Sequence, residues 1–197
     1  MGKSGLFWIV AVGFFAGILL GQQYLVRQGS DLLPGSGGDF TLQSSQGPVS
    51  LNQFKGKVVA VYFGYMACPD ICPTSLWNLS QGLKLLTAEQ QAQIKGIFIS
   101  VDYERDTPQA LEIFSQGFHP NIIGLTGTSR EQVDKVARQY GAIYEKVALE
   151  DSAMGYVIDH SSIIYLLDRE GIVRYRVPHA ESPEAIAQYL RELLEQR

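Results

Sequence analysis

The sequence contains two cysteines, Cys68 and Cys72, with only three residues between them. Such a pair can form a structural disulfide, act as a redox couple or supply two thiolate ligands to a metal ion. A disulfide that closes so short a loop restrains the unfolded chain less than one that spans most of the sequence. The pair is therefore interpreted as chemically active.

A predicted buried strand precedes the cysteines. Val58–Tyr65 is a β-branched and aromatic run that ends around Gly64, the pattern of a parallel strand covered on both faces. Pro73 predicts the start of the next helix, because proline is favoured at the first helical position and breaks a helix interior. Cys72 then lies near the helix cap and Cys68 in the loop before it, where the partial positive charge of the helix end favours a thiolate.

Asp102 follows a second predicted strand, Ile94–Val101. A crossover helix, Thr74–Leu86, separates it from the first strand and carries leucines at helical spacing. A strand–helix–strand unit of this kind is right-handed and makes the two strands parallel neighbours or nearly so. Asp102 is then near the thiols, at the sheet edge where α/β proteins form their sites. A solvated loop acid is the alternative interpretation.

His160 precedes a predicted strand, residues 161–167, instead of following one. If that strand runs antiparallel to the cysteine strand, its start shares an edge with the cysteine strand's end. His160 then faces Cys68 and Cys72. From the residues alone, a structural or merely exposed histidine remains the alternative. The other two histidines, His119 and His179, flank prolines in predicted loops and are interpreted as surface residues.

Three segments carry a family resemblance: Gly64–Pro73 with its Cys-Pro-Asp-Ile-Cys-Pro run, Val101–Pro108, and Val157–Asp168 with its Asp-His-Ser run. Together they resemble the Sco/SenC family of membrane-anchored copper proteins, which have a thioredoxin-like fold and assist cytochrome c oxidase assembly. Met66 stands where the family usually has threonine, and Tyr103 where it often has proline. Met66 could offer copper a thioether, although a gap-filling core methionine is the more ordinary interpretation.

The resemblance implies a copper site with Cys68, Cys72 and His160 as ligands, and with Asp70 and Asp102 in the surrounding shell. Thiolates suit Cu(I), and imidazole adds a ligand that Cu(II) accepts, so both states are expected. Zinc is the main alternative, but a closed structural zinc site would need a fourth ligand.

Leu6–Leu20 is an uncharged apolar run flanked by Gly5 and Gly21, and a helix over these 17 residues would span roughly 25 Å, just short of a bilayer core. No cleavage site of the Ala-x-Ala kind follows, which favours an uncleaved anchor over a signal peptide. Lys3 points the N-terminus to the cytoplasm, and the lack of an Arg- and Ser-rich presequence favours a bacterial inner membrane, with the C-terminal domain in the periplasm. We expect an anchor over residues 1–28, a flexible linker over 29–38 and a copper-binding domain over 39–197.

The remaining segments predict an α/β, thioredoxin-like fold with an extra N-terminal hairpin, behind the single N-terminal transmembrane helix. The hairpin surrounds Gly47, and a helix begins at Thr107-Pro108 and runs through Ser115. A short strand over 121–126 precedes a helix capped by the 129–132 capping box and closed by Gly141. Strands over 142–148 and 154–158 flank a mobile acidic loop at 150–151. A hairpin of 161–167 and 172–177 leads to a last helix from Ser182-Pro183.

The net charge of −4 argues against a nucleic-acid partner, since binding phosphates needs a basic face. The first functional hypothesis is delivery of copper to the dinuclear copper site of cytochrome c oxidase. The expected partners are the oxidase subunit that holds that site or another copper chaperone, and membrane lipid around the N-terminal helix. The second hypothesis is a thiol–disulfide reductase that acts on the oxidase cysteines. A peroxide reductase is a weaker third, because the chain lacks a Thr-x-x-Cys approach to the nucleophile and an evident arginine near Cys68.

Overall fold

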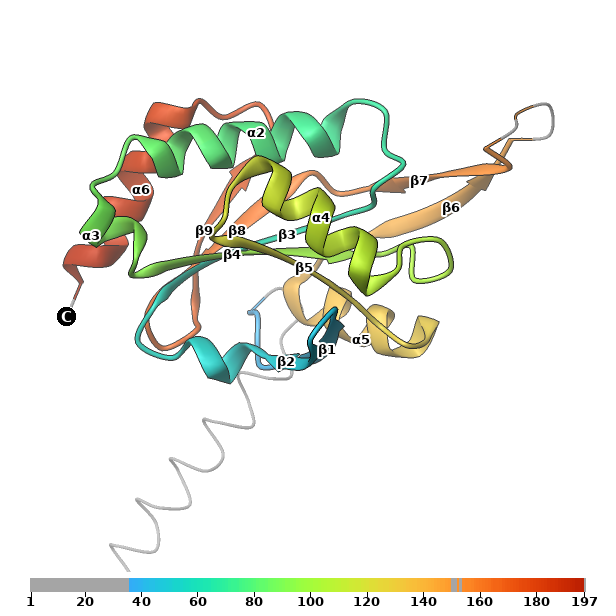
Figure 1. Cartoon of the computed structure of the whole chain (residues 1–197), viewed down its shortest axis with the longest axis horizontal. Coiled ribbons are helices and arrows are strands. Elements are labelled where there is room, and N and C mark those ends of the chain that lie inside the picture. The colour runs from blue at the N-terminus through green and yellow to red at the C-terminus, as the bar shows by residue number, and fades with distance from the viewer. Residues whose placement is uncertain (1–35, 150–151, 153, 197) are drawn as a thin grey trace, which may run out of the picture.

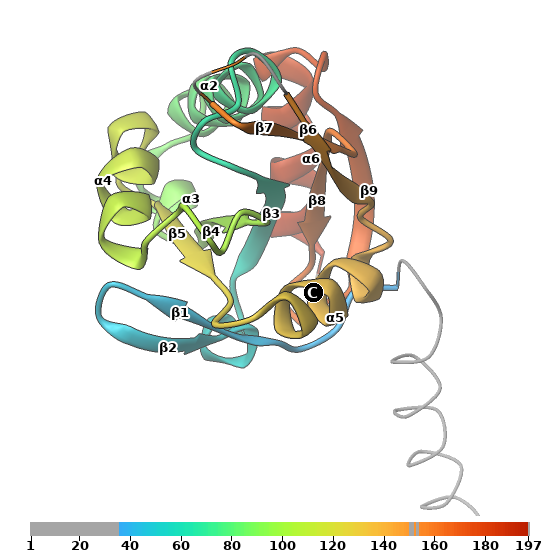
Figure 2. The ribbon, with the colours of Figure 1, turned by 90° about the vertical axis from the view of Figure 1, so that its right-hand side faces the viewer.

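The computed structural model describes residues 36–149, 152 and 154–196. A seven-stranded mixed sheet forms its centre, in the order β2-β1-β5-β4-β3-β8-β9. Helices α2, α4 and α6 cover one face of the sheet, and α5 covers the opposite face (Figures 1 and 2). The fold is the thioredoxin-like α/β architecture that the sequence predicts, with a hairpin added before it.

The central strand is β3, Val58–Gly64, in which every residue is buried. It pairs in parallel with β4, Ile94–Ser100, and antiparallel with β8, Ile163–Leu167. The parallel pairing is the one that the strand–helix–strand unit predicts, and the antiparallel pairing meets the condition under which His160 would face the cysteines. They bring the end of β3, the end of β4 and the start of β8 to one edge of the sheet.

Helix α2 spans Ile71–Lys84, so it begins two residues earlier than the prediction that Pro73 occupies its first position. Asp70 is the N-cap, and the Thr74 N–H donates to the Asp70 carbonyl at 3.2 Å. The first N–H groups of a helix have no acceptor inside it. The missing N–H of Pro73 therefore removes no hydrogen bond at the third helical position, and Cys72 lies within the first turn.

The other predicted elements are present with small shifts in their ends. Strands β1 and β2 form the N-terminal hairpin, and β1 also pairs with β5; β8 and β9 form the C-terminal hairpin. Two short elements, η1 and α3, lie outside the predictions and have four residues each. The bounds are β1 Thr41–Ser44, β2 Gly47–Ser50, η1 Leu51–Phe54, α3 Ala88–Gln91, α4 Pro108–Phe118, β5 Ile122–Thr126, α5 Arg130–Tyr140, β9 Val173–Pro178 and α6 Pro183–Glu195.

Local signals explain where these helices start and stop. Thr107, Ser129 and Ser182 each accept a backbone hydrogen bond at the start of α4, α5 and α6. Gly141 ends α5 in the left-handed region at φ 69°, a conformation that favours glycine. Helix α4 continues three residues beyond its predicted end at Ser115.

Strands β6, Tyr144–Ala148, and β7, Tyr156–His160, pair only with each other and form a separate two-stranded sheet that projects from the main one (Figure 1). The prediction ended the second of these strands at residue 158. It ends instead at His160, so that histidine closes β7 as well as preceding β8. The acidic loop predicted at 150–151 lies outside the described residues.

The predicted anchor, 1–28, and most of the predicted linker also lie outside the described residues. Of the helices in the part of the chain that the structure describes, none combines the length and hydropathy of a membrane span. Ser36–Gly38, at the end of the predicted linker, pack against α5. The Gly37 N–H donates to the Gln139 carbonyl at 2.9 Å, and the Tyr140 hydroxyl donates to the Gly38 carbonyl at 3.1 Å.

His119 is not a surface residue, contrary to the prediction. It follows α4, is only 5% exposed, and its Nδ1 accepts a hydrogen bond from the Asn121 N–H at 3.1 Å. Burial, together with the nearby charge of Lys84, lowers the pKa of His119. The flanking Pro120 signals a loop but carries no information about which side of that loop faces the core.

Candidate metal centre

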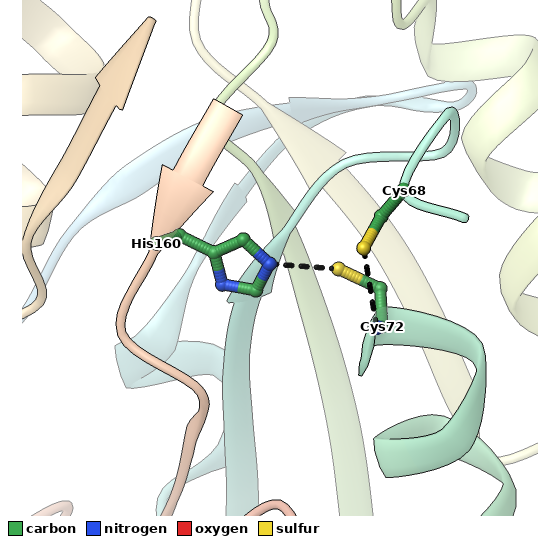
Figure 3. A group of neighbouring side chains, drawn as sticks. All are labelled: Cys68, Cys72 and His160. Carbon is green, nitrogen blue, oxygen red and sulfur yellow. Dashed lines mark hydrogen bonds between the residues drawn. The ribbon is translucent and has the colours of Figure 1, made fainter. Parts of the chain in front are cut away.

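The ligand atoms of Cys68, Cys72 and His160 lie within 4.8 Å of one another (Figure 3). Cys68 lies in the loop after β3, Cys72 in the first turn of α2, and His160 at the end of β7. Cys72 Sγ is 3.1 Å from His160 Nε2, and the Cys72 N–H donates to Cys68 Sγ at 3.4 Å. Both cysteines are free thiols. The structure thus brings together the three residues that the sequence analysis proposed as ligands.

Gly64, the last residue of β3, makes room for Cys72. A Cβ atom at this position would lie 2.6 Å from Cys72 Sγ and 2.9 Å from Phe98 Cε2. Cys72 is fully buried there, whereas Cys68 and His160 are half-buried. One thiol is therefore fixed inside the protein, and the other two donors reach the surface.

Two aromatic rings orient His160. Tyr62 and Tyr65 meet the imidazole edge to face, with centroid distances of 6.1 and 6.0 Å. His160 Nδ1 lies 3.4 Å from the carbonyl of Ser161. When Nδ1 carries the proton and donates to that carbonyl, Nε2 keeps its lone pair for a metal ion beside Cys72.

The two thiols differ in how readily they ionise. A hydrogen bond from Cys72 is the main cause that lowers the pKa of Cys68; burial opposes it, while His160 and the N–H groups of Asp70 and Cys72 add to it. The same hydrogen bond and burial raise the pKa of Cys72. Cys68 is therefore the thiol that ionises first, as its place before a helix N-terminus favours.

Asp70 and Asp102, the two acidic residues expected around the ligands, have different environments. Asp70 is exposed, and it is its backbone N–H that interacts with Cys68. Asp102 is 3% exposed at the expected sheet edge, where its carboxylate accepts hydrogen bonds from Arg105 and from the Tyr156 hydroxyl at 2.7 Å. Asp102 thus contacts the strand that carries His160. Neither Arg105 nor Tyr156 was singled out from the sequence, although Arg105 lies in one of the three family-like segments.

A cavity of about 380 Å³ adjoins the site. Its walls include Tyr65, Pro69 and Ile71 on one side and Val157 on the other, and it reaches Cys68 and His160. Met66 lies outside this lining and packs against the core, as an ordinary core methionine does.

The donor set fits one soft metal ion. Metal–sulfur and metal–nitrogen distances of about 2.0–2.3 Å allow two ligand atoms of one ion to be up to about 4.6 Å apart. The observed span of 4.8 Å therefore needs only small side-chain movements. Two thiolates and one imidazole select Cu(I), Cu(II) or zinc over hard cations such as magnesium or calcium, which take oxygen ligands.

Most of the chain matches one known protein family. Residues 31–195 match the model of the SCO1/SenC family. The SCO2-like protein of Rickettsia conorii is 36% identical over 156 residues, which cover 79% of this chain and 75% of that protein.

Solved structures of Sco proteins are similar to this chain in both sequence and fold. The structure of Bradyrhizobium japonicum ScoI with copper bound is 36% identical, covers 80% of this chain and 99% of its own, and has a TM-score of 0.71. BsSco, a member of the Sco family of cytochrome c oxidase assembly proteins in which a disulfide switch has been identified, is 26% identical with a TM-score of 0.64 and covers 84% and 96%. The chain belongs to the SCO1/SenC family.

Proposed function

We propose that this chain binds copper through Cys68, Cys72 and His160 and delivers it to the dinuclear copper site of cytochrome c oxidase. The observation that carries the proposal is the convergence of two thiols and one imidazole, from three separate segments, within 4.8 Å. The chain's family membership and its copper-bound relative ScoI support copper over zinc.

Transfer of Cu(I) needs only ligand exchange. Thiolates of the recipient displace Cys68 and Cys72 in turn, and no electron moves. Cys68 and His160 are half-buried beside the open cavity, so an incoming ligand can reach the ion from that side. Because Cys72 is fully buried, we expect it to be the last ligand that releases the copper ion.

The test is the copper stoichiometry of the full-length protein, purified in detergent under reducing, anaerobic conditions. We expect one copper per chain and no zinc. Cys68→Ser and Cys72→Ser should each abolish tight Cu(I) binding, because one thiolate and one imidazole serve a soft ion poorly. Met66→Leu, which removes the nearby thioether, is the matched control and should bind as the parent does. Undiminished Cu(I) affinity in either cysteine variant would place the ligands elsewhere.

A second candidate function is thiol–disulfide reduction of the oxidase cysteines, supported by the free thiols and the more readily ionised Cys68. The Cys68 thiolate would attack a substrate disulfide and form a mixed disulfide, releasing one substrate thiolate that takes up a proton. Cys72 would then lose its proton and attack Cys68, releasing the second substrate thiol. The protein ends as a Cys68–Cys72 disulfide, and a dithiol reductant has to restore it.

We also propose that residues 1–28 anchor the protein by one membrane-spanning helix in a bacterial inner membrane, with the copper-binding domain in the periplasm. The uncharged run Leu6–Leu20 supports this, as does the lack of a cleavage site after it. An anchor would keep the copper site close to a membrane-bound oxidase.

A further inference from the structure

The loop between β4 and α4, residues 101–107, contacts both segments that carry the proposed copper ligands. On one side it meets the cysteine loop, and on the other it meets β7. We call Asp102, Arg105 and Asp106 the brace. These three residues lie close together in the sequence, whereas the cysteine loop and β7, which they connect, are far apart in the sequence.

Asp106 holds the cysteine loop. It is 3% exposed, and its Oδ2 accepts hydrogen bonds from the Met66 N–H at 2.9 Å and from the Ser100 hydroxyl at 2.6 Å. Met66 is two residues before Cys68. The buried carboxylate therefore ties the end of β4 to the backbone that leads into the first ligand.

Arg105 holds the start of β7. Its Nη1 donates to the carbonyls of Met154 and Tyr156, each at 3.2 Å, and its Cζ lies 3.6 Å from the centroid of the Tyr156 ring. Its Nε donates to Asp102, and Asp102 in turn accepts a hydrogen bond from the Tyr156 hydroxyl. Arg105 and Asp102 together thus bind both the backbone and the side chain of Tyr156.

A second cation completes the contact. Lys146 on β6 lies 3.7 Å from the Tyr156 ring centroid and forms an ion pair with Glu104 at 2.8 Å. The ring is thus held by Arg105 and Lys146. Partly desolvated cation–π contacts of this kind are directional, so they orient the ring as well as attract it.

These contacts matter because β6 and β7 are not part of the main sheet. A two-stranded hairpin is marginal by itself and takes its orientation from what it packs against. His160 is the last residue of β7, four residues after Tyr156. If the start of β7 swings, the direction in which His160 leaves the strand changes as well.

We infer that Arg105 and Asp102 are positioning residues that fix β7, and with it His160, against the cysteine loop, so that all three ligands can meet one copper ion. The inference rests on the proposed copper function. It predicts that losing the brace affects Cu(II), which needs the imidazole, more than Cu(I), which two thiolates can hold.

The test compares Arg105→Ala with Arg174→Ala in the full-length protein. Arg174 is a matched control, because its Nε donates to the buried Asp168 just as the Nε of Arg105 donates to Asp102. Asp168 follows β8 at the opposite end of the sheet from the site. We measure Cu(I) and Cu(II) affinity, the thiolate-to-Cu(II) absorption, and hydrogen exchange of residues 156–160 in the copper-free protein.

We expect Arg105→Ala to keep one Cu(I), to lose about 10- to 100-fold in Cu(II) affinity with an altered absorption band, and to exchange faster in β7. Arg174→Ala should have the copper affinity, the absorption band and the β7 hydrogen exchange of the parent protein. Tyr156→Phe removes only the hydrogen bond from the Tyr156 hydroxyl to Asp102, so it should lower Cu(II) affinity and speed hydrogen exchange in β7 by less than Arg105→Ala does. It is the test variant if Arg105→Ala does not fold.

The inference would be overturned if a folded Arg105→Ala protein had the Cu(II) absorption and the β7 hydrogen exchange of the parent. If Arg105→Ala does not fold, the same result in Tyr156→Phe would overturn it. An effect as large in Arg174→Ala would also overturn it, since loss of any buried ion pair would then be the cause. If the parent protein binds no copper, the proposed function fails instead, and the exchange of β7 still reports whether the brace holds the strand.

Discussion

Gly64 and Cys72 are matched in shape: a Cβ atom on the glycine would lie 2.6 Å from the sulfur of the cysteine. Non-bonded carbon and sulfur atoms do not approach so closely. The last residue of the central strand therefore has to be glycine for the buried thiol to occupy its place beside His160. A residue without any ligand atom thus helps to determine the site.

Gly64→Ala should displace Cys72 and weaken Cu(I) binding, while the fold survives with a loss of about 1–3 kcal/mol in the free energy of unfolding, as is usual for overpacking. Copper titration and urea denaturation of the same preparation check the two effects. The matched control is Gly117→Ala on α4, where a Cβ atom would meet nothing within 4 Å. That change should leave copper binding intact and raise stability by up to about 1 kcal/mol, because alanine favours a helix. Equal copper affinity in Gly64→Ala and the parent would contradict the steric argument.

Much of this site can be predicted from the sequence because its signals are local. The apolar run of β3, the crossover after it and the strand after His160 each have a readable pattern. The topology rule for a strand–helix–strand unit then brings the ends of β3 and β4 to one edge, and antiparallel pairing with β3 brings the start of β8 to the same edge. The start of α2 was misplaced because a proline is compatible with any position in the first helical turn, so Pro73 does not single out one residue.

The brace and the burial of His119 could not be read in the same way. Arg105 binds Tyr156, 51 residues further along, and no periodicity in either segment records that contact. His119 is covered by tertiary packing, which a neighbouring proline does not report. These features depend on how elements meet in space, and local patterns describe only how each element forms.

The buried His119 should make stability depend on pH. Burial lowers its pKa in the folded protein below the unfolded value, so the unfolded chain binds more protons just below about pH 6.5. Stability from this group is therefore complete above the unfolded pKa and is lost as the pH falls towards the folded one. In His119→Gln this contribution is absent. Urea midpoints measured between about pH 5 and pH 7.5 should fall less steeply in the variant towards acid; parallel curves would show that His119 does not titrate differently on folding.

The proposed anchor predicts how the full-length protein fractionates. With Leu6–Leu20 in the bilayer, the protein should sediment with membranes and resist carbonate extraction, because the insertion of a spanning apolar helix into the hydrocarbon core is effectively irreversible. Protease added from the periplasmic side should digest the domain. A variant with Val10→Arg and Phe14→Arg should leave the membrane fraction, since each charge at the centre of a span costs about 2.5–3.5 kcal/mol on insertion scales. A soluble parental protein that begins near residue 22 would instead indicate a cleaved signal peptide.

His160 distinguishes copper delivery from thiol–disulfide reduction. A dithiol can reduce a disulfide without a metal, and a nearby imidazole then matters only by tuning thiolate ionisation. A copper site differs, because Cu(II) prefers more ligands and nitrogen donors than two thiolates provide. His160→Ala should therefore keep some Cu(I), lose stable Cu(II) and its thiolate-to-copper absorption, and fail to support oxidase assembly.

The same His160→Ala protein should still exchange disulfides with a small disulfide substrate at close to the parental rate. His179→Ala is the matched control: His179 lies on the loop after β9, and its backbone N–H donates to the Ser162 carbonyl. This control should retain copper binding, exchange and oxidase assembly. If assembly survives in His160→Ala but fails in both Cys68→Ser and Cys72→Ser, the thiols alone carry the function, and reduction of the oxidase cysteines replaces copper delivery as the activity of this chain.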